Sequence, residues 1–329
     1  MGQRPSTSQP GSVWPYGIKK LNDSVFELYK PEQGVMTEVE IIFFHGLARL
    51  DDYKNERSDD YKNAFWKTWM SREETPRLWP QALLGPTIPK ARILSVSYNS
   101  SAQNLKDEAP GEMDEYNIAE NWVQDIILNY TTSLGQDRPV ILVGHSVGAI
   151  IVKVFILMCI RMMKQSTGSV SEKISKFLRN CKGVFYYSPP HAGSTMANAI
   201  AKLRDANKPM MNLLTTMNNE TVQINSAFAN ARKTSLTIKT RAITETRSTT
   251  YKGIKGIFVS QHSANEDIDM LYTADADHFD ICRPPNDTSA IFTQLVTFIK
   301  DTLGELGIPL TVLSSEDREI ARQTAEEIM

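Results

Sequence analysis

The stretch VILVGHSVGAI, residues 140–150, joins an apolar run to a serine flanked by glycines and then to a second apolar run. The G-x-S-x-G pattern alone is weak evidence, because glycine and serine frequencies produce it by chance in roughly one chain of this size in ten. Its context is more selective, since the residues before it are typical of a strand and AIIVKVFILMCIRMM (149–163) is apolar on nearly every side, like a buried helix. A strand, a sharp turn and an immediate helix predict a nucleophile elbow that holds Ser146 above the sheet in a strained conformation.

Strand-like and helix-like segments alternate along the rest of the chain. The predicted strands are VFELY (25–29), EVEIIFFHG (38–46), ARILSVSY (91–98), VILVG (140–144), GVFYYS (183–188), LTIKTRAIT (236–244) and IKGIFVS (254–260). Helices are predicted at about 115–130, 149–163, 172–179, 194–230 with interruptions, and 291–303. Because most of the strands are apolar throughout, we expect an α/β fold with a mostly parallel central sheet and helices on both faces.

Length and composition predict one large globular unit. The chain has 329 residues, with 41% hydrophobic and 22% charged residues. We expect a single domain over 21–308, preceded by a disordered tail over 1–20 and followed by a helical tail over 309–329. Five residues of that last segment recur at helical spacing: Ile320, Ala321, Thr324, Ala325 and Ile328. This tail could dock on the domain or lead into a partner or a further region.

Charge and cysteine content indicate which partners and which cellular compartment to expect. The formal net charge is −2 and basic residues are scattered, which argues against nucleic acid as a partner. Cys159, Cys181 and Cys282 form neither a disulfide framework nor a metal cluster, so we expect a reducing, intracellular location, cytoplasmic or peripheral to an organelle membrane, rather than secretion. The longest apolar run is too short to span a bilayer. Gly2 and Ser6 fit the M-G-x-x-x-[ST] myristoylation pattern, and a plain disordered tail explains the same residues.

A serine nucleophile needs a base, and the base needs an orienting acid. In the fold expected here, the chain order is serine, acid, histidine. His278 lies in a loop between the last predicted strand and the final helix, where the base belongs, and His262 is the alternative. Glu245 directly follows the strand 236–244 and is the expected acid. The other candidates for the acid come later and fit surface positions better: Asp267, Asp269, Asp275 and Asp277.

Two backbone N–H groups are needed to bind the oxyanion of an acyl-transfer intermediate. One should come from Val147, the residue after the nucleophile, and the other from Leu47 in the FFHGL turn (43–47) that follows an earlier strand. A charged repeat, DDYKN at 51–55 and 59–63, follows this turn. Charge runs are usually solvated loops, and its place directly after the HGL turn could also put it at the rim of the site. Neither a cofactor nor a metal is required by this chemistry.

Several blocks in the expected order resemble a known group. FFHGL, KTW (67–69), LWPQALL (78–84), ARILSVSY, DRPVILVGHSVGAIIVK (137–153), GVFYYSPPHAGS (183–194), ITET (243–246) and DADHFDICRP (275–284) resemble the lipase-like α/β-hydrolases of the serine-active-site-containing protein family, relatives of the GPI inositol-deacylase-like serine esterases. The resemblance covers about residues 39–300. It places the nucleophile on Ser146, the acid on Glu245 and the base on His278. It also implies that the PPHAGS turn (189–194) shapes an acyl pocket.

The resulting hypothesis is a serine esterase or lipase that cleaves a carboxylic ester, often that of a lipid, through an acyl-enzyme on Ser146. The family also implies work at intracellular membranes, so peripheral membrane association fits. Two alternatives stay open: a non-catalytic binding or signalling module that keeps the hydrolase pocket, and a transacylase that passes the acyl group to an alcohol other than water. Nothing in the chain indicates the oligomeric state, the acyl chain length or the head group.

Overall fold

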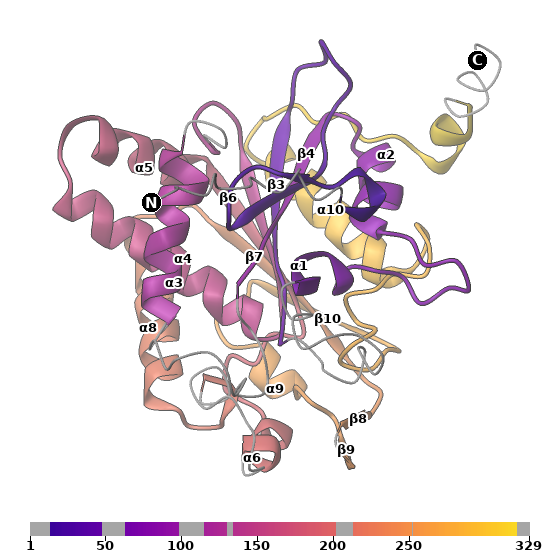
Figure 1. The fold of residues 1–329 in the computed structure, drawn as a ribbon. Helices are drawn as coiled ribbons and strands as arrows, with labels where there is room; N and C mark the ends of the chain where they lie inside the picture. The colour runs from indigo at the N-terminus through magenta and orange to yellow at the C-terminus, as the bar shows by residue number, and fades with distance from the viewer. Residues whose placement is uncertain are drawn as a thin grey trace, which may run out of the picture.

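The structure is a computed structural model in which residues 14–47, 63–98, 115–129, 134–201, 213–251 and 253–320 are described. Several sequence-based predictions fall outside these ranges: residues 1–13 of the predicted tail with the myristoylation pattern at Gly2, the DDYKN repeat except Asn63, and residues 321–329 of the predicted C-terminal helix. Figure 1 shows a central sheet with helices on two sides.

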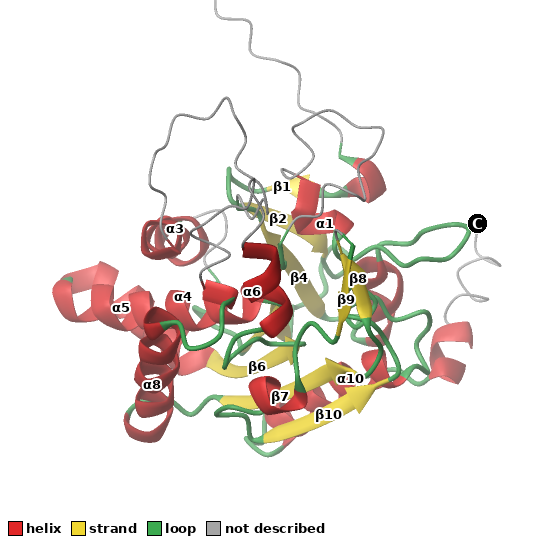
Figure 2. Cartoon of the chain, turned by 90° about the horizontal axis from the view of Figure 1, so that it is seen from below, coloured by secondary structure: helices red, strands yellow, loops and turns green. Residues whose placement is uncertain are grey.

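Ten strands are described, and eight of them form the central sheet. The strands are β1 (Lys19–Lys20), β2 (Val25–Tyr29), β3 (Val39–Phe44), β4 (Ala91–Val96), β5 (Val140–His145), β6 (Cys181–Tyr187), β7 (Lys239–Glu245), β8 (Thr249–Tyr251), β9 (Ile254–Gly256) and β10 (Met270–Ala274). The sheet order is β1-β2-β4-β3-β5-β6-β7-β10. The pairs β1–β2 and β2–β4 are antiparallel, and all the other pairs are parallel. β8 and β9 pair as a separate hairpin (Figure 2).

The helical elements connect these strands. They are η1 (Pro15–Gly17), α1 (Ala64–Lys67), η4 (Pro80–Leu84), α2 (Gly85–Thr87), α3 (Glu115–Trp122), η5 (Val123–Leu128), α4 (Val147–Gln165), α5 (Gly168–Asn180), α6 (Thr195–Ala201), α8 (Asn219–Thr234), α9 (Gln261–Ala264) and α10 (Ala290–Gly304). Figure 1 shows α3, α4, α5 and α8 on one side of the sheet and α10 on the other.

Alternation along the central strands explains why their sequences are apolar throughout. On β5, Leu142 packs into the core beneath α4, whereas Ile141 and Val143 pack into the core beneath α10. Successive side chains of a strand point to opposite faces, and both faces of this sheet are covered, so polar residues have no solvent-facing positions here. The predicted α/β-hydrolase fold, with a mostly parallel sheet and helices on both faces, is confirmed by this topology.

The parallel register brings the ends of the central strands to one edge. Phe44 of β3 pairs with Gly144 of β5, which pairs with Tyr186 of β6, and Glu245 of β7 pairs with Ala274 of β10. The loops that follow these strands therefore gather at the carboxyl edge of the sheet, where open α/β sheets bind their ligands.

The last predicted strand is wrong. Of IKGIFVS (254–260), only Ile254–Gly256 is extended, and it pairs with β8 rather than joining the sheet. The final sheet strand is β10, a short edge strand of sequence MLYTA whose residues are exposed or half-buried, unlike those of the central strands. Phe258 and Val259 are apolar because they are buried beside the carboxyl edge, not because they lie in a strand.

The described parts of both predicted tails contact the domain. Disorder over 1–20 is wrong for the described part, because the Trp14 ring packs 5.4 Å from that of Phe65 and β1 pairs with β2. At the other end, the Thr311 amide donates to Glu38 at 2.6 Å and the Arg318 guanidinium pairs with Asp287. Helical residues begin at 315 rather than 309, and this segment docks on the domain.

The start of α4 crosses β3 at very short range. A Cβ built on Gly148 would lie 2.5 Å from the carbonyl oxygen of His45 and still closer to that of Phe44. Both atoms are backbone, so neither can move aside as a side chain would. The crossing therefore requires glycine at this position.

Gly148→Ala is expected to lower the free energy of unfolding by about 1–3 kcal/mol or more, because the added methyl group forces β3 and α4 apart. Urea denaturation monitored by circular dichroism measures the change. Gly304→Ala is the matched control, since a Cβ there meets nothing within 4 Å and alanine is the better helix former. Equal stability of Gly148→Ala and the wild-type protein would contradict the tight crossing.

Candidate active site

Ser146 occupies the turn between β5 and α4. Its backbone has φ 55° and ψ −129°, a left-handed conformation that costs a non-glycine residue about 1–3 kcal/mol. The Ser146 amide donates to the carbonyl of Tyr187 at 3.0 Å, which anchors the turn to the neighbouring strand. The strained turn thus places a serine hydroxyl at the carboxyl edge of the sheet.

Two glycines make room for this turn. A Cβ on Gly144 would lie 2.9 Å from the Cα of Ala149, and one on Gly46 would lie 3.0 Å from the Cβ of Ser146. The FFHGL segment therefore passes directly beside the serine. Larger residues at either position would push the turn away from the strands that support it.

His278 connects Ser146 to Glu245 through both of its ring nitrogens. Its Nε2 lies 2.9 Å from Ser146 Oγ, and its Nδ1 lies 3.3 Å from Glu245 Oε2. An ionised carboxylate only accepts hydrogen bonds, so Nδ1 carries the proton and Nε2 accepts from the serine hydroxyl. All three side chains are at most 2% exposed. The structure thus brings together the three residues that the sequence singled out.

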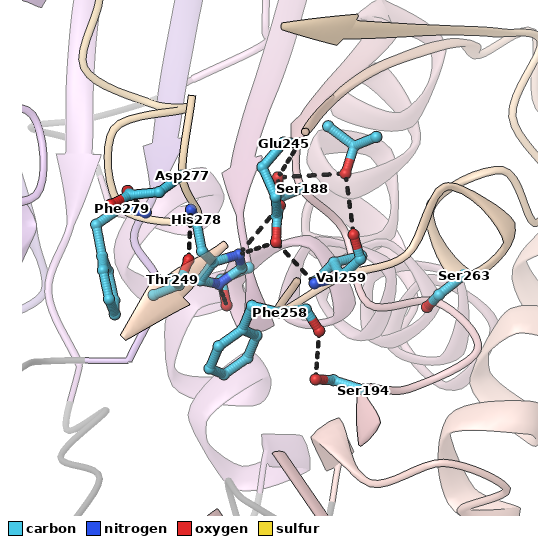
Figure 3. A network of polar contacts seen from close by, with 12 residues as sticks. Ser188, Ser194, Glu245, Thr249, Phe258, Val259, Ser263, Asp277, His278 and Phe279 are labelled. Carbon is cyan, nitrogen blue, oxygen red and sulfur yellow. Dashed lines mark hydrogen bonds and ion pairs between the residues drawn. The ribbon is translucent and has the colours of Figure 1, made fainter. Parts of the chain in front are cut away.

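The Glu245 carboxylate is held from several sides (Figure 3). The Ser188 hydroxyl donates to Oε2, and the Val259 amide donates to Oε1 at 2.7 Å. Burial pushes the pKa of Glu245 upward, but the charge of His278 and these hydrogen bonds outweigh it and lower the pKa below its ordinary value. Glu245 is therefore ionised at neutral pH despite its burial.

The backbone of His278 is held by hydrogen bonds at both its carbonyl and its amide. His145 Nε2–H donates to the His278 carbonyl at 2.9 Å, and the His278 amide donates to the Thr249 hydroxyl at 2.9 Å. Burial lowers the pKa of His145 to about 3, so its ring is neutral and acts as a fixed donor. His145 therefore links the loop that carries His278 to the turn at Ser146.

The remaining histidines lie apart from the serine hydroxyl. His45 stacks on Tyr98, and burial lowers its pKa to about 4. Burial also lowers the pKa of His191, which packs edge-on against Tyr186. His262, the alternative base, is exposed on α9. Among these residues, only His278 is placed to accept the proton of Ser146.

The alternative acids are engaged elsewhere. Asp267 and Asp269 pair with Arg232, Asp275 is an exposed partner of Arg247, and Asp277 caps the backbone of the residues that follow it. Of the acids considered from the sequence, only Glu245 contacts the His278 ring.

The two expected oxyanion donors belong to segments next to Ser146. Val147 is the first residue of α4, where backbone N–H groups have no intrahelical partner. Leu47 follows Gly46, whose backbone abuts the serine side chain. The positive end of the α4 dipole lies at the same place and favours a developing negative charge.

A cavity of about 580 Å³ opens beside this site, between α6, β9 and α9. Gly193, Ser194, Met196 and Phe258 are among the residues that line it. The PPHAGS turn is fixed to α9, because the Ser263 hydroxyl donates to the Gly193 carbonyl at 2.7 Å. The turn therefore has a defined shape next to the base and its acid.

The described residues hold neither a candidate metal site nor a candidate membrane span. Within the described ranges, no group of three or more histidine, cysteine or acidic side chains could hold a metal ion. Among the described helices, none is both long and apolar enough to cross a membrane. The three cysteines are buried and unpaired.

Sequence reasoning missed the residues that support the serine, the base and the acid. Ser188 and Val259 reach Glu245 from other strands and loops, and Phe258 stacks on the His278 ring. Nothing in their local patterns marks them, because each contact joins segments that are distant in sequence. Ser188 is the last residue of the predicted strand GVFYYS (183–188), and its place at a strand end is the one signal that could have drawn attention to it.

The strand order and the serine at the turn after β5 define an α/β-hydrolase fold. No model of a known protein family matches the chain. It is similar to Protein SERAC1 of Danio rerio, with 28% identity over 295 residues that cover 87% of this chain and 42% of the relative, and to Protein SERAC1 of Homo sapiens, with 26% identity over 302 residues and the same coverage. The chain spans less than half the length of these relatives.

Solved structures show weaker similarity. The mature lipase BlEst2 from Bacillus licheniformis has a TM-score of 0.42 and 14% identity, covering 85% of this chain and 97% of that one. Phospholipase PlaB from Legionella pneumophila has a TM-score of 0.41 and 14% identity, covering 69% of this chain and 46% of that one. The fold assignment therefore rests on the strand order described above.

Lys153 lies two turns beyond Ser146 on α4 and is fully buried. Its ammonium donates to Asn225 at 2.8 Å, and Asn225 donates to the His191 carbonyl at 2.6 Å, so this chain of contacts supports the PPHAGS turn. Burial lowers the pKa of Lys153 from 10.5 to about 7. Between these two values, the unfolded chain binds more protons at this group than the folded protein does.

Stability should therefore rise with pH in that window, because unfolding takes up a proton there. The free energy of unfolding of the wild-type protein is expected to rise relative to that of Lys153→Met by roughly 1 kcal/mol per pH unit between pH 7 and 9.5. Urea denaturation at a series of pH values measures the difference. Lys233→Met, at an exposed position on α8, should follow the wild-type curve. Parallel curves for the wild-type protein and Lys153→Met would contradict the buried-lysine account.

Proposed function

We propose that this protein is a serine hydrolase that cleaves a carboxylic ester through an acyl-enzyme on Ser146. The observation that carries the proposal is the hydrogen-bonded chain from Ser146 through His278 to Glu245, with the serine on a strained strand-to-helix turn. Nucleophile, base and orienting acid in this relation are the arrangement that acyl-transfer chemistry requires.

In the first step, Ser146 Oγ bonds to the ester carbonyl carbon while its proton passes to His278 Nε2. The carbonyl oxygen becomes an oxyanion, and the backbone N–H groups of Leu47 and Val147 stabilise it, each by about 3 kcal/mol. Glu245 stabilises the imidazolium that forms. The tetrahedral intermediate then expels the alcohol, which takes the proton from His278.

In the second step, water repeats the sequence on the acyl-enzyme. His278 accepts a proton from the attacking water, the oxyanion forms in the same place, and collapse frees the carboxylic acid and restores the Ser146 hydroxyl. An alcohol in place of water would give transacylation by the same steps. Hydrolysis and transfer therefore differ only in the acceptor.

We further propose a lipid ester as the substrate and association with the periphery of a membrane. Support comes from the resemblance to the serine-active-site-containing protein family. The cavity beside the PPHAGS turn supports a role for this turn in shaping an acyl pocket, since Gly193 and Ser194 line it and Phe258 joins it to the His278 ring.

Substitutions at the three side chains should separate catalysis from binding. Ser146→Ala and His278→Gln are expected to lower kcat about 10⁴- to 10⁶-fold, and Glu245→Gln about 10⁴-fold, because the base loses its orientation and its charge partner. Hydrolysis of p-nitrophenyl butyrate measures the effect. Asp275→Asn is the control, since Asp275 is exposed and does not contact the ring. A Glu245→Gln variant as active as the wild-type protein would contradict the assignment of the acid.

A panel of p-nitrophenyl esters from acetate to palmitate, assayed with and without phosphatidylcholine vesicles, tests the substrate class. The proposal predicts that kcat/KM rises with chain length and that vesicles increase turnover of the long esters. Preference for short soluble esters would contradict a lipid substrate while leaving the esterase chemistry intact. No turnover of any ester by folded protein would favour a non-catalytic binding module.

A further inference from the structure

The ring of Phe258 lies face to face with the ring of His278. Their centroids are 4.1 Å apart and their planes differ by 13°. Phe258 is only 4% exposed, so solvent does not separate the two rings (Figure 3). The imidazole therefore has an aromatic π-face against one of its own faces, while its two nitrogens engage Ser146 and Glu245 in the ring plane.

The backbone around Phe258 is fixed by the same network. The Ser194 hydroxyl donates to the Phe258 carbonyl, and the amide of the next residue, Val259, donates to Glu245. Two consecutive residues thus contact the base and its acid, one through an aromatic ring and the other through a backbone amide. A shift of this segment would change the ring plane of His278 and the position of the Glu245 carboxylate together.

The charged and titratable groups near the His278 ring differ from Phe258 in how they act on the ring. Glu245 is the anion in contact with the ring, and its lowered pKa keeps it charged. The nearby His145 ring, 5.2 Å away, has a pKa of about 3 and stays neutral. On the following loop, Asp280 pairs with Arg72 at 2.6 Å and Asp277 binds backbone amides. Burial raises the pKa of the Asp280 carboxyl, which is paired with Arg72 rather than with the His278 ring. The π-face of Phe258 attracts only the protonated form of His278.

We propose that Phe258 is a positioning residue for the base: it holds the ring plane of His278 and stabilises the imidazolium that forms as Ser146 attacks. The proposal rests on the proposed function, in which His278 accepts the serine proton. At a desolvated site, an aromatic face shifts the protonation equilibrium of the neighbouring ring toward the cation by about 3- to 30-fold. The same factor should appear in the rate, because the transition state contains the protonated ring.

The test compares Phe258→Leu and Phe258→Met, which keep apolar volume but lack a π-face, with Phe258→Tyr, which keeps the face. Phe258 borders a cavity of about 580 Å³, which offers space for the hydroxyl group that tyrosine adds. Using the full chain and p-nitrophenyl butyrate, we expect the aliphatic variants to lose about 3- to 30-fold in kcat with KM nearly unchanged. The acidic limb of their kcat/KM profile should move to lower pH by about 0.5–1.5 units. Phe258→Tyr should keep both kcat and the position of the acidic limb close to those of the wild-type protein.

The control Phe292→Leu removes a buried aromatic ring from the opposite core, against Trp79, and should leave the pH profile in place. A rate loss in both aliphatic variants without movement of the acidic limb, or movement to higher pH, would overturn the proposal and leave Phe258 a packing residue. An NMR titration of the His278 ring in the Ser146→Ala background, with and without Phe258→Leu, measures the midpoint of ring protonation without turnover. Absence of ester hydrolysis by the wild-type protein would therefore defeat the proposed function, whereas an unmoved NMR midpoint would defeat the role of Phe258.

Discussion

The contact between the start of α4 and the end of β3 is the constraint on which the site depends. Gly148 approaches the carbonyl groups of Phe44 and His45 so closely that no side chain fits between them. This approach brings together two segments about 100 residues apart in sequence. As a result, the strained serine turn and the FFHGL segment share one small region at the carboxyl edge of the sheet, beside the first N–H groups of α4.

Around that contact, buried polar groups are paired with one another across several elements. Burial alone would raise the pKa of Glu245, and a charged carboxylate without partners is costly in a low-dielectric interior. Donors from Ser188, Val259 and His278 offset this cost, and His145 binds the backbone of His278 in turn. The arrangement fixes the tautomer of His278, which leaves Nε2 free to accept the serine proton. Rigid pairing of this kind favours catalysis because little reorganisation is needed when charge develops.

Local patterns in the sequence predicted the central fold, and they singled out three side chains that the structure brings into hydrogen-bond contact. The turn at Ser146 could be predicted because strand, glycines and helix are contiguous, and His278 and Glu245 because chain order in this fold is informative. β10 was missed because it is a short strand of five residues between aspartate-rich segments. IKGIFVS was assigned to the sheet because its apolar residues are buried for another reason. The contacts of Ser188, Phe258 and His145 could not be predicted, since each depends on the relative placement of distant segments.

The central claim is that Ser146 is an activated nucleophile. The most direct measurement is reaction of the folded protein with a fluorophosphonate at neutral pH, followed by intact-mass analysis and peptide mapping. The account predicts one phosphonate per chain, located on Ser146, and strongly slowed labelling at low pH, where a protonated His278 cannot accept the serine proton. A folded protein that takes up no phosphonate, or takes it up at another residue, would contradict the account.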